Sequence, residues 1–510
     1  TRGAPVTGEK VKIAKDSWVK ADTTIPVLDS LLLLGTLEMD HGPSQDRTFT
    51  IDATYVYILG GKLMAGCAGQ TTFNGKLDII LRGDHSTPVW PRTQGPNIGS
   101  KVIASFGGLD LHGTDVPLTW TKLAQTAAAG SNVLVLSEDV NWAAGSQILI
   151  APTSYDVLET ETMTIQSVAA DKRTVTLTSN LAYKHIAASE TFANGKGYSI
   201  GAEVGLLSRN IRIIGGEYAN QDTEAYGARV LVGVTADATR TYTGYARLSN
   251  VEFVRSGQEG YTATFDPRYG VSFMDIGELG NIKPCYVKKC AFHHGYSTAI
   301  GVFGVHGLEI QDNVIHRTVG PSIHTVSKST RLRRNFMALS FWRGTYNGRY
   351  EVNNFDYYGT IESIGARELV MQGNAVTGSE RGLYHGPAED CTSTAEPWMD
   401  NTLHTGMMGT LVMPVDKDNP LYNQADRCLQ LANFTIWKCY DYGFYHNTPF
   451  DIEVRRNTLL ENGVGIFLFV WGPSALDHQF RDHYMKVEDT LIVGQTSEFD
   501  CTTDNYDISN

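Results

Sequence analysis

The feature that most constrains this chain is an asparagine that recurs before short runs of strand-forming residues. The steps begin, in order, at Asn210, Asn250, Cys290, Asn313, Asn335, Asn374, Asn401, Asn433, Asn457 and Asp489. The shortest separations are 23 residues from Cys290 to Asn313 and 22 from Asn313 to Asn335. A period of this length is typical of one turn of a three-sided coil of strands, and longer steps indicate an inserted loop or two turns.

Stacked turns place equivalent side chains in columns. An inward-pointing asparagine can donate its amide to the next asparagine in the column, while apolar residues two positions apart fill the interior. The sequence therefore predicts an all-β chain folded as a right-handed parallel β-helix. Its structural ladder is predicted to comprise Asn210, Asn250, Asn313, Asn335, Asn374, Asn401 and Asn457.

The N-terminal part repeats through glycine rather than asparagine. Glycines at 35, 61, 83 and 108 separate short alternating strands by 22 to 26 residues, which indicates a coil of the same pitch. Residues 118–200 break the period and contain short strands of the antiparallel type. We interpret them as a small β-barrel or sandwich inserted beside the coil.

Several long segments resemble the fibrocystin-L and fibrocystin family. The segments are Trp120–Leu123, Asp139–Ile148, Leu181–His185, Leu109–Gly113, Ser256–Tyr261, Asp266–Tyr269, Phe292–Tyr296, Asp312–His316 and Asn433–Cys439. The resemblance implies a G8 domain followed by parallel β-helix repeats, within a long single-pass cell-surface protein. It implies the following domains: a lead-in at 1–17, a G8 domain at 18–140, the overlapping insert at 118–200, and β-helix repeats at 201–510. Relatives with a G8 domain are associated with hyaluronan breakdown, but no family catalytic motif can be placed on this chain residue by residue.

Composition excludes several classes of protein. The net charge is −13, with 55 acidic against 42 basic residues, which argues against a nucleic-acid partner. The longest apolar run, Val464–Trp471, is too short to cross a bilayer. Because the chain opens on Thr1-Arg2-Gly3 and ends on a polar stretch, we interpret it as a mature protein or a piece of a longer one.

Seven cysteines occur without metal-binding spacing. Cys391 and Cys428 lie in loop-like inserts, and we predict a disulfide between them. The glycosylation motif Asn433-Phe434-Thr435 requires an outward-facing asparagine. Since Asn433 also belongs to the repeat, its two roles conflict, and we favour the inward structural role.

Catalytic candidates come from offsets along the repeat. His293, His316 and His404 each lie three residues after a repeat position, so His293 and His316 are predicted to be stacked neighbours. Such a column can act as acid and base or bind a transition metal. The alternative is a polar face beside a turn, which we favour.

A second set of candidates is Glu259, Asp266 and Arg268, either as a sugar-cleft cluster or, as we favour, an ion-paired loop. No cofactor is predicted, and a calcium ion among the acidic loops is possible but has no readable spacing. We expect an extracellular structural or recognition segment of a cell-surface protein that binds a glycan or protein ligand and does not enter the membrane. The alternatives are a glycosaminoglycan-cleaving enzyme and a non-catalytic glycan-binding module.

Overall fold

A computed structural model of the chain describes residues 5–40, 47–67, 69, 71–91, 94–221, 223–259, 267–280, 284–342, 358–385, 397–412, 428–447, 451–469 and 484–499. The described residues form β-strands and a single short 3-10 helix, η1 (Val157–Glu159). The predicted all-β parallel coil with an antiparallel insert is confirmed. The chain comprises two compact units: unit 1 is 1–116, 207–331 and 342–355, and unit 2 is 117–206, 332–341 and 356–510.

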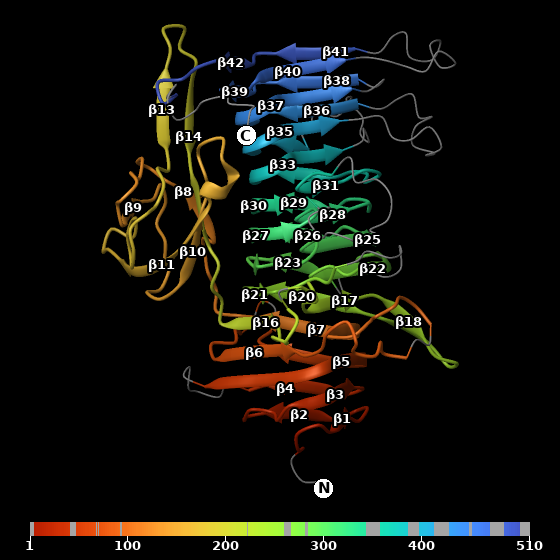
Figure 1. Ribbon diagram of the computed structural model, residues 1–510. Coiled ribbons are helices and arrows are strands. Elements are labelled where there is room, and N and C mark those ends of the chain that lie inside the picture. Colours follow the sequence, from red (N-terminus) through yellow and green to blue (C-terminus); the bar gives the residue numbers. More distant parts are fainter. Residues whose placement is uncertain are drawn as a thin grey trace, which may run out of the picture. The chain divides into compact units, whose positions relative to one another are not determined.

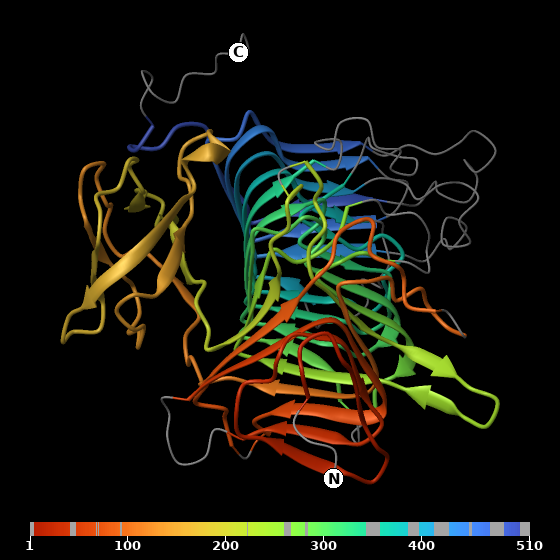
Figure 2. The ribbon, with the colours of Figure 1, turned by 60° about the horizontal axis from the view of Figure 1, so that its bottom comes forward.

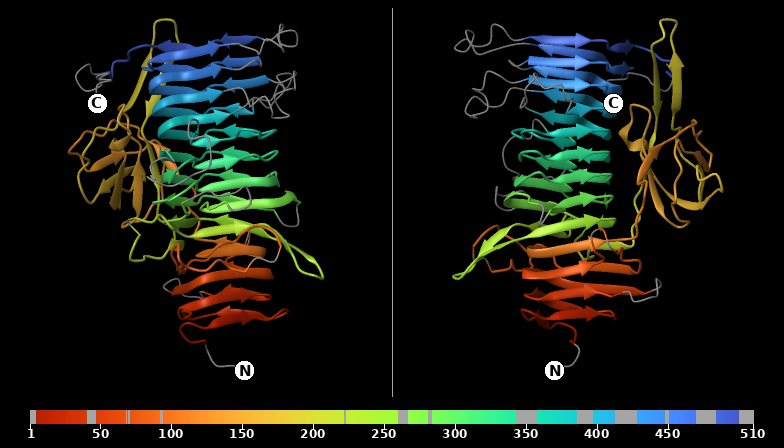
Figure 3. Two further views of the ribbon diagram at one scale, coloured as in Figure 1. Left: turned by 45° about the vertical axis from the view of Figure 1, so that its right-hand side comes forward. Right: turned by 180° about the vertical axis from the view of Figure 1, so that it is seen from behind.

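Unit 1 is a three-sided coil of parallel strands, whose rungs can be followed in Figures 1 and 3. Face A contains β6 (Lys76–Leu81), β16 (Ile211–Gly215), β21 (Val251–Val254), β24 (Ala291–His293) and β27 (Val314–Val319). Face B contains β1 (Lys10–Ile13), β3 (Leu28–Leu33), β17 (Arg229–Val232), β22 (Val271–Glu278), β25 (Ile300–His306) and β28 (Ile323–Thr325). Face C contains β2 (Trp18–Ala21), β4 (Thr36–Met39), β20 (Tyr245–Ser249), β23 (Tyr286–Lys288) and β26 (Glu309–Gln311).

Two long strands of unit 1 bend around the corners of the coil. β5 (Thr48–Ala65) contributes to all three faces, and β7 (Val102–His112) contributes to faces B and C. The antiparallel hairpin β18 (Val234–Ala236) and β19 (Thr241–Thr243) projects from this unit (Figure 2). Because β1 pairs with β3 in register, the coil already begins within the residues predicted as a lead-in.

Unit 2 contains a second run of rungs with the same three faces. Face A has β30 (Phe336–Phe341), β39 (Thr458–Leu460) and β42 (Leu491–Val493); face B has β31 (Ile361–Glu362) and β40 (Val464–Phe469). Face C has β32 (Val370–Gln372), β34 (Trp398–Met399), β36 (Cys428–Ala432), β38 (Asp451–Arg455) and β41 (Met485–Glu488). The bent strands β33 (Ala375–His385), β35 (Thr402–Val412) and β37 (Thr435–Asn447) cover faces A and B. The division between the units falls within β29 (Arg331–Arg333).

The insert of unit 2 lies in the sequence between β7 and β16. Its antiparallel sheet has the order β8 (Trp120–Lys122), β15 (Glu203–Leu206), β10 (Gln147–Ile150), β11 (Glu161–Val168), β12 (Thr174–Leu177), β9 (Val133–Val135). Ala124 N donates to Val135 O at 2.8 Å, and Ser137 N donates to Lys122 O at 2.9 Å. These bonds join the first strand to the last, so the sheet closes as a small barrel. A hairpin, β13 (Ala187–Thr191) and β14 (Gly197–Gly201), extends from it.

The asparagine ladder runs without interruption from Asn335 to Asn401 in unit 2. Asn335 Nδ2 donates to Asn374 Oδ1 at 2.9 Å, and Asn374 Nδ2 donates to Asn401 Oδ1 at 3.0 Å. Asn457 Oδ1 accepts from the backbone N of Phe434 at 2.7 Å. All of these asparagines are buried, so their amides satisfy backbone groups at a corner that water does not reach.

In unit 1 only Asn313 lies at this ladder position, where its Oδ1 accepts from Cys290 N at 2.8 Å. The prediction is wrong for Asn210 and Asn250. Because Glu252, Ala291 and Val314 share one column, the residue aligned with Asn313 is Val251, and Asn250 lies one position earlier. Asn250 has a φ of 54°, as has Asn433 in unit 2.

Asparagine tolerates this left-handed conformation better than most residues, so it is suited to either of two adjacent corner positions. Asn210 and Asn250 instead bind loops of unit 1. Asn210 Nδ2 donates to Phe73 O at 2.7 Å, and Asn250 Oδ1 accepts from Val116 N at 3.1 Å. The repeat thus marks the corner of each rung, but not always the inward position.

Candidate functional site

The histidines predicted to stack, His293 in β24 and His316 in β27, are paired directly across face A of unit 1. Both are buried. His293 Nε2 lies 3.1 Å from Glu252 Oε1, and His293 Nδ1 lies 2.8 Å from His294 Nδ1. The rings of His294 and His316 are 6.4 Å apart between centroids. We call these four residues the histidine cluster.

Burial lowers the pKa of two histidines of this cluster, His294 and His316. Burial, together with the neighbouring His294, His293 and Arg317, lowers the pKa of His316 to about 3. Partial burial and the same kind of neighbours lower the pKa of His294 to about 4. The carboxyl group of Glu252 faces His293, whose Nδ1 in turn contacts Nδ1 of the exposed His294. This order resembles a base held by an orienting partner, which is the arrangement of general acid–base sites.

The cluster does not provide a metal centre. No group of three or more His, Cys, Asp or Glu side chains in the described part of the chain is arranged to hold a metal ion. His316 Nδ1 is buried without a hydrogen-bond partner among the described residues. His293 and His316 therefore lie at an interior edge of the coil, whereas His294 is exposed.

The second predicted cluster is held together by contacts within a loop. Arg268 Nη1 donates to the backbone carbonyl of Glu259 at 3.0 Å, and not to its carboxylate. The Glu259 carboxylate is buried, lies 2.6 Å from His85 Nε2, and accepts from Ala225 N at 3.1 Å. Asp266 lies outside the described residues. The Glu259 carboxylate is thus bound by His85 and Ala225 from other segments of the chain, and the ion-paired loop stays a prediction.

A further cluster, which the sequence did not predict, lies where the insert of unit 2 meets the coil of the same unit. His404 Nε2, in β35, lies 2.8 Å from Glu203 Oε2, in β15. The His404 ring stacks on the Trp437 ring, with 4.1 Å between the two centroids. Lys122 Nζ lies 3.4 Å from the other oxygen of Glu203. Burial alone raises the pKa of Glu203, but His404 and Lys122 outweigh it and lower that pKa to about 2.

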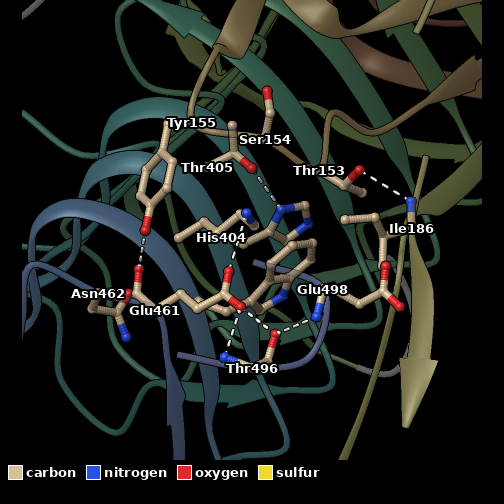
Figure 4. A network of polar contacts seen from close by, with 12 residues as sticks. Thr153, Ser154, Tyr155, Ile186, His404, Thr405, Glu461, Asn462, Thr496 and Glu498 are labelled. Carbon is tan, nitrogen blue, oxygen red and sulfur yellow. Dashed lines mark hydrogen bonds and ion pairs between the residues drawn. The ribbon is translucent and has the colours of Figure 1, made fainter. Parts of the chain in front are cut away.

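Beside it lies a buried ion pair between Lys438 and Glu461, at 3.0 Å. The Lys438 ammonium lies 5.0 Å from the centroid of the Tyr155 ring, and the Tyr155 hydroxyl donates to Glu461 O at 2.6 Å. Thr496 donates through both its backbone N and its hydroxyl to the Glu461 carboxylate. Figure 4 shows Tyr155 of the insert and Thr496 of the coil converging on Glu461.

We call Glu203, His404, Lys438, Glu461 and Tyr155 the insert clamp. The first four are at most 4% exposed. Substrate groups in solvent therefore have no access to them, and their chemistry is that of internal ion pairing. Removing one partner of such a pair typically costs about 3–5 kcal/mol, because a buried charge loses its partner.

The insert is also attached to the coil of unit 2 beyond the clamp. Tyr198 and Ile200 of β14 form a buried cluster with Trp437 and Leu460 of the coil. At the surface, Lys196 pairs with Asp489 at 2.5 Å, and Lys184 pairs with Glu498 at 3.1 Å. Apolar burial gives this contact its strength, and the exposed pairs add little.

Sequence reasoning missed Glu252, His294 and the clamp for different reasons. Glu252 belongs to the rung before His293, so a search at one fixed offset does not find it. The adjacent His293-His294 pair was a usable signal. Glu203 and His404 are 201 residues apart and have no repeat relation, so nothing local connects them.

Of the predicted modification sites, Asn433 lies at the surface, Cys428 is buried and Cys391 lies outside the described residues. Asn433 is exposed, and its Nδ2 donates to Asp400 Oδ1 at 2.5 Å. The inward role favoured for Asn433 is therefore wrong, because Phe434 occupies the ladder position. Cys428 is buried at the start of β36, while Cys391 lies outside the described residues. The disulfide between them stays a prediction, as does a glycan on Asn433.

Two family models match parts of the chain. Residues 1–124 match the G8 domain, and residues 235–327 match the CEMIP beta-helix. Among solved structures, the tailspike protein gp49 of Pseudomonas phage LKA1 is 10% identical, with a TM-score of 0.31, over 95% of this chain and 74% of that one. No helix in the described ranges is both long enough and apolar enough to span a membrane.

Curated relatives match almost the entire chain. Human fibrocystin-L is 39% identical over 98% of this chain and 12% of its own length. Fibrocystin of the dog is 27% identical over 98% of this chain and 11% of its own length. This chain therefore spans only a small part of these relatives. The predicted resemblance is confirmed: the chain, with its G8 domain and parallel β-helix, is similar over nearly its whole length to one part of fibrocystin-L and fibrocystin.

Proposed function

We propose that this chain is a rigid structural and recognition segment of a large extracellular cell-surface protein, and that it does not convert a substrate chemically. The observation that carries the proposal is the insert clamp. Its ionisable groups are paired with one another and buried, and they attach an antiparallel barrel to the rungs of unit 2. Such an arrangement stiffens the segment, since barrel and coil cannot separate without exposing unpaired charges.

The family relation supports the location. Fibrocystin-L relatives match the chain over nearly its whole length, which favours a segment of a cell-surface protein. A β-helix presents a long regular surface and does not require a single deep pocket, which suits adhesion or recognition. The partners we expect are an extracellular glycan or a protein ligand.

The alternative is a glycosaminoglycan-cleaving enzyme, and one observation favours it. Glu252, His293 and His294 form a chain of contacts that ends at an exposed imidazole. A general base of this kind needs access to substrate, and only His294 of the cluster is exposed.

One assay separates the two functions. The purified chain is incubated with sized hyaluronan and chondroitin, with and without calcium, and polymer length is followed by light scattering. We expect no shortening under any condition. Shortening that is lost in His294→Ala, but kept in the control variant His306→Ala outside both predicted clusters, would overturn the proposal and establish the enzyme. Retention on the immobilised polymers without shortening supports recognition.

A further inference from the structure

A groove of about 610 Å³ crosses the first rungs of unit 1, at the corner between faces B and C. Four successive corners of the coil form one side and the floor, and the segment around β19 forms the other side. β19 packs against β5 and β7. The groove therefore belongs to a single unit, and its shape is fixed by the rungs themselves.

The floor of the groove is bare backbone. Gly35, Gly61 and Gly107 occupy consecutive corners, and a Cβ added to Gly61 would lie 2.4 Å from the carbonyl oxygen of Gly35. A Cβ on Gly107 would lie 2.3 Å from the carbonyl oxygen of Gly61. No side chain fits here, so peptide groups line the floor and a ligand can approach them closely.

One wall is a register-aligned column of face C. Trp18 pairs with Thr36, Thr36 with Lys62, and Lys62 with Gly108, which pairs with Tyr245. Four steps between rungs make this column about 19 Å long. That length suits several units of an extended polymer.

One aromatic side chain of the groove, Trp18, is held in place with its ring exposed. Trp18 is 66% exposed, yet its Nε1 donates to Glu38 Oε2 at 2.7 Å, which fixes the indole. On the opposite wall Tyr242 carries the Arg240 guanidinium 4.3 Å from its ring centroid. An exposed, ordered tryptophan is an unusual surface feature, and a preformed site of this kind loses little freedom on binding.

The groove is cationic although the chain as a whole is acidic. Lys15, Lys62 and Arg240 line it, against Asp16 as an acid. The buried Asp110 below it lies 2.7 Å from Lys62 Nζ and also binds Arg247, so one carboxylate is shared by two cations. This cluster retains one positive charge, which favours an anionic ligand.

We propose that this groove binds a stretch of a carboxylate-bearing polysaccharide. The apolar face of a sugar ring stacks on Trp18, the hydroxyl groups of the polymer meet the peptide groups of the floor, and its carboxylates meet Lys62 and Arg240. A peptide is the less suitable ligand, because the bare floor provides no separate pockets for side chains. The inference rests on the proposed recognition function and names the ligand class and its site.

The test measures binding of the whole chain to immobilised unsulfated chondroitin and polygalacturonate, with neutral dextran as comparison. We expect Trp18→Ala and Arg240→Gln each to weaken binding about tenfold. The matched control Trp342→Ala removes another exposed tryptophan outside the groove and leaves binding unchanged. Raising the salt concentration is expected to weaken wild-type binding more than binding by Arg240→Gln.

Thermal melts verify that each variant is folded. Because the Trp18 side chain is exposed, we expect its replacement to leave the fold intact. Equal binding by Trp18→Ala and Trp342→Ala would overturn the groove as the site while leaving polysaccharide recognition standing. The proposed ligand class would be overturned by any of three results: no binding to either acidic polymer, equal binding to dextran, or binding of acidic peptides instead of the polymers. Polymer shortening in the enzymatic assay is a separate outcome that contradicts the proposed function.

Discussion

Replacing Asn374 by alanine removes the central member of the amide ladder. Asn374 Oδ1 accepts from the backbone N of Asn335 at 3.0 Å and from the side-chain amide of the same residue at 2.9 Å. Its Nδ2 donates to Leu332 O at 2.9 Å and to Asn401 Oδ1 at 3.0 Å. The side chain is 1% exposed, so water cannot replace these four bonds without opening the coil. At about 1–3 kcal/mol for each buried backbone group that loses this partner, Asn335 N and Leu332 O, we expect a loss of about 2–6 kcal/mol in the free energy of unfolding.

The matched control is Asn433→Ala. Asn433 belongs to the same sequence repeat but is exposed, with one side-chain bond to Asp400. We expect its replacement to cost at most about 1–2 kcal/mol, because alanine fits the left-handed φ of 54° less well than asparagine. Urea unfolding followed by tryptophan fluorescence gives both values, provided that the dependence on urea concentration stays the same. Equal shifts of the midpoint in the two variants would refute the ladder as a source of stability.

Three further predictions concern the clamp, the pH dependence and the sequon. Glu203→Ala should lower the unfolding free energy by about 3–5 kcal/mol, because His404 loses its buried partner. In the same urea experiment, the double variant Glu203→Ala with His404→Ala should lose less stability than the sum of the losses in the two single variants. Burial lowers the pKa of His446 to about 3. The stability that neutral His446 contributes is therefore complete above pH 6.5, and it is lost by about 1.4 kcal/mol per pH unit as the pH falls below 6.5. Thermal melts between pH 7.5 and 5 should show a shallower loss of stability for His446→Gln than for the wild type, and an equal pH dependence in the two would contradict this. Because Asn433 is exposed, the chain secreted from eukaryotic cells should carry a glycan there, seen as a mass shift that Asn433→Gln abolishes. A wild-type chain secreted without a glycan would contradict this prediction.

The repeat in the sequence predicted the coil because periodicity is a property of every rung. Asn335, Asn374 and Asn401 are separated by irregular distances, yet each precedes strand-forming residues, and each lies on the ladder. The same signal failed by one residue at Asn210 and Asn250. Asparagine is favoured both at the left-handed corner and at the inward position that follows it, so residue type alone does not distinguish the two.

The candidate sites, like the ladder, were only partly predictable from the sequence. His293 and His316 were found from their offsets, since strands that pair in register preserve an offset from rung to rung. The sequence showed the glycines of the groove as separators of strands, but it did not show that Trp18 and Tyr245 flank them in one column. That column required the exact pairing of β2, β4, β5, β7 and β20.

What the sequence determined by itself was the pitch and the class of the fold: about two dozen residues a turn, amides at the corners and an interruption at residues 118–200. These follow from local preferences that act within one turn. The tertiary structure alone decided how the insert binds the coil of unit 2, through Glu203 with His404 and Tyr155 with Glu461. Such contacts join segments hundreds of residues apart, and their energy depends on the burial of both partners, which no local pattern in the sequence encodes.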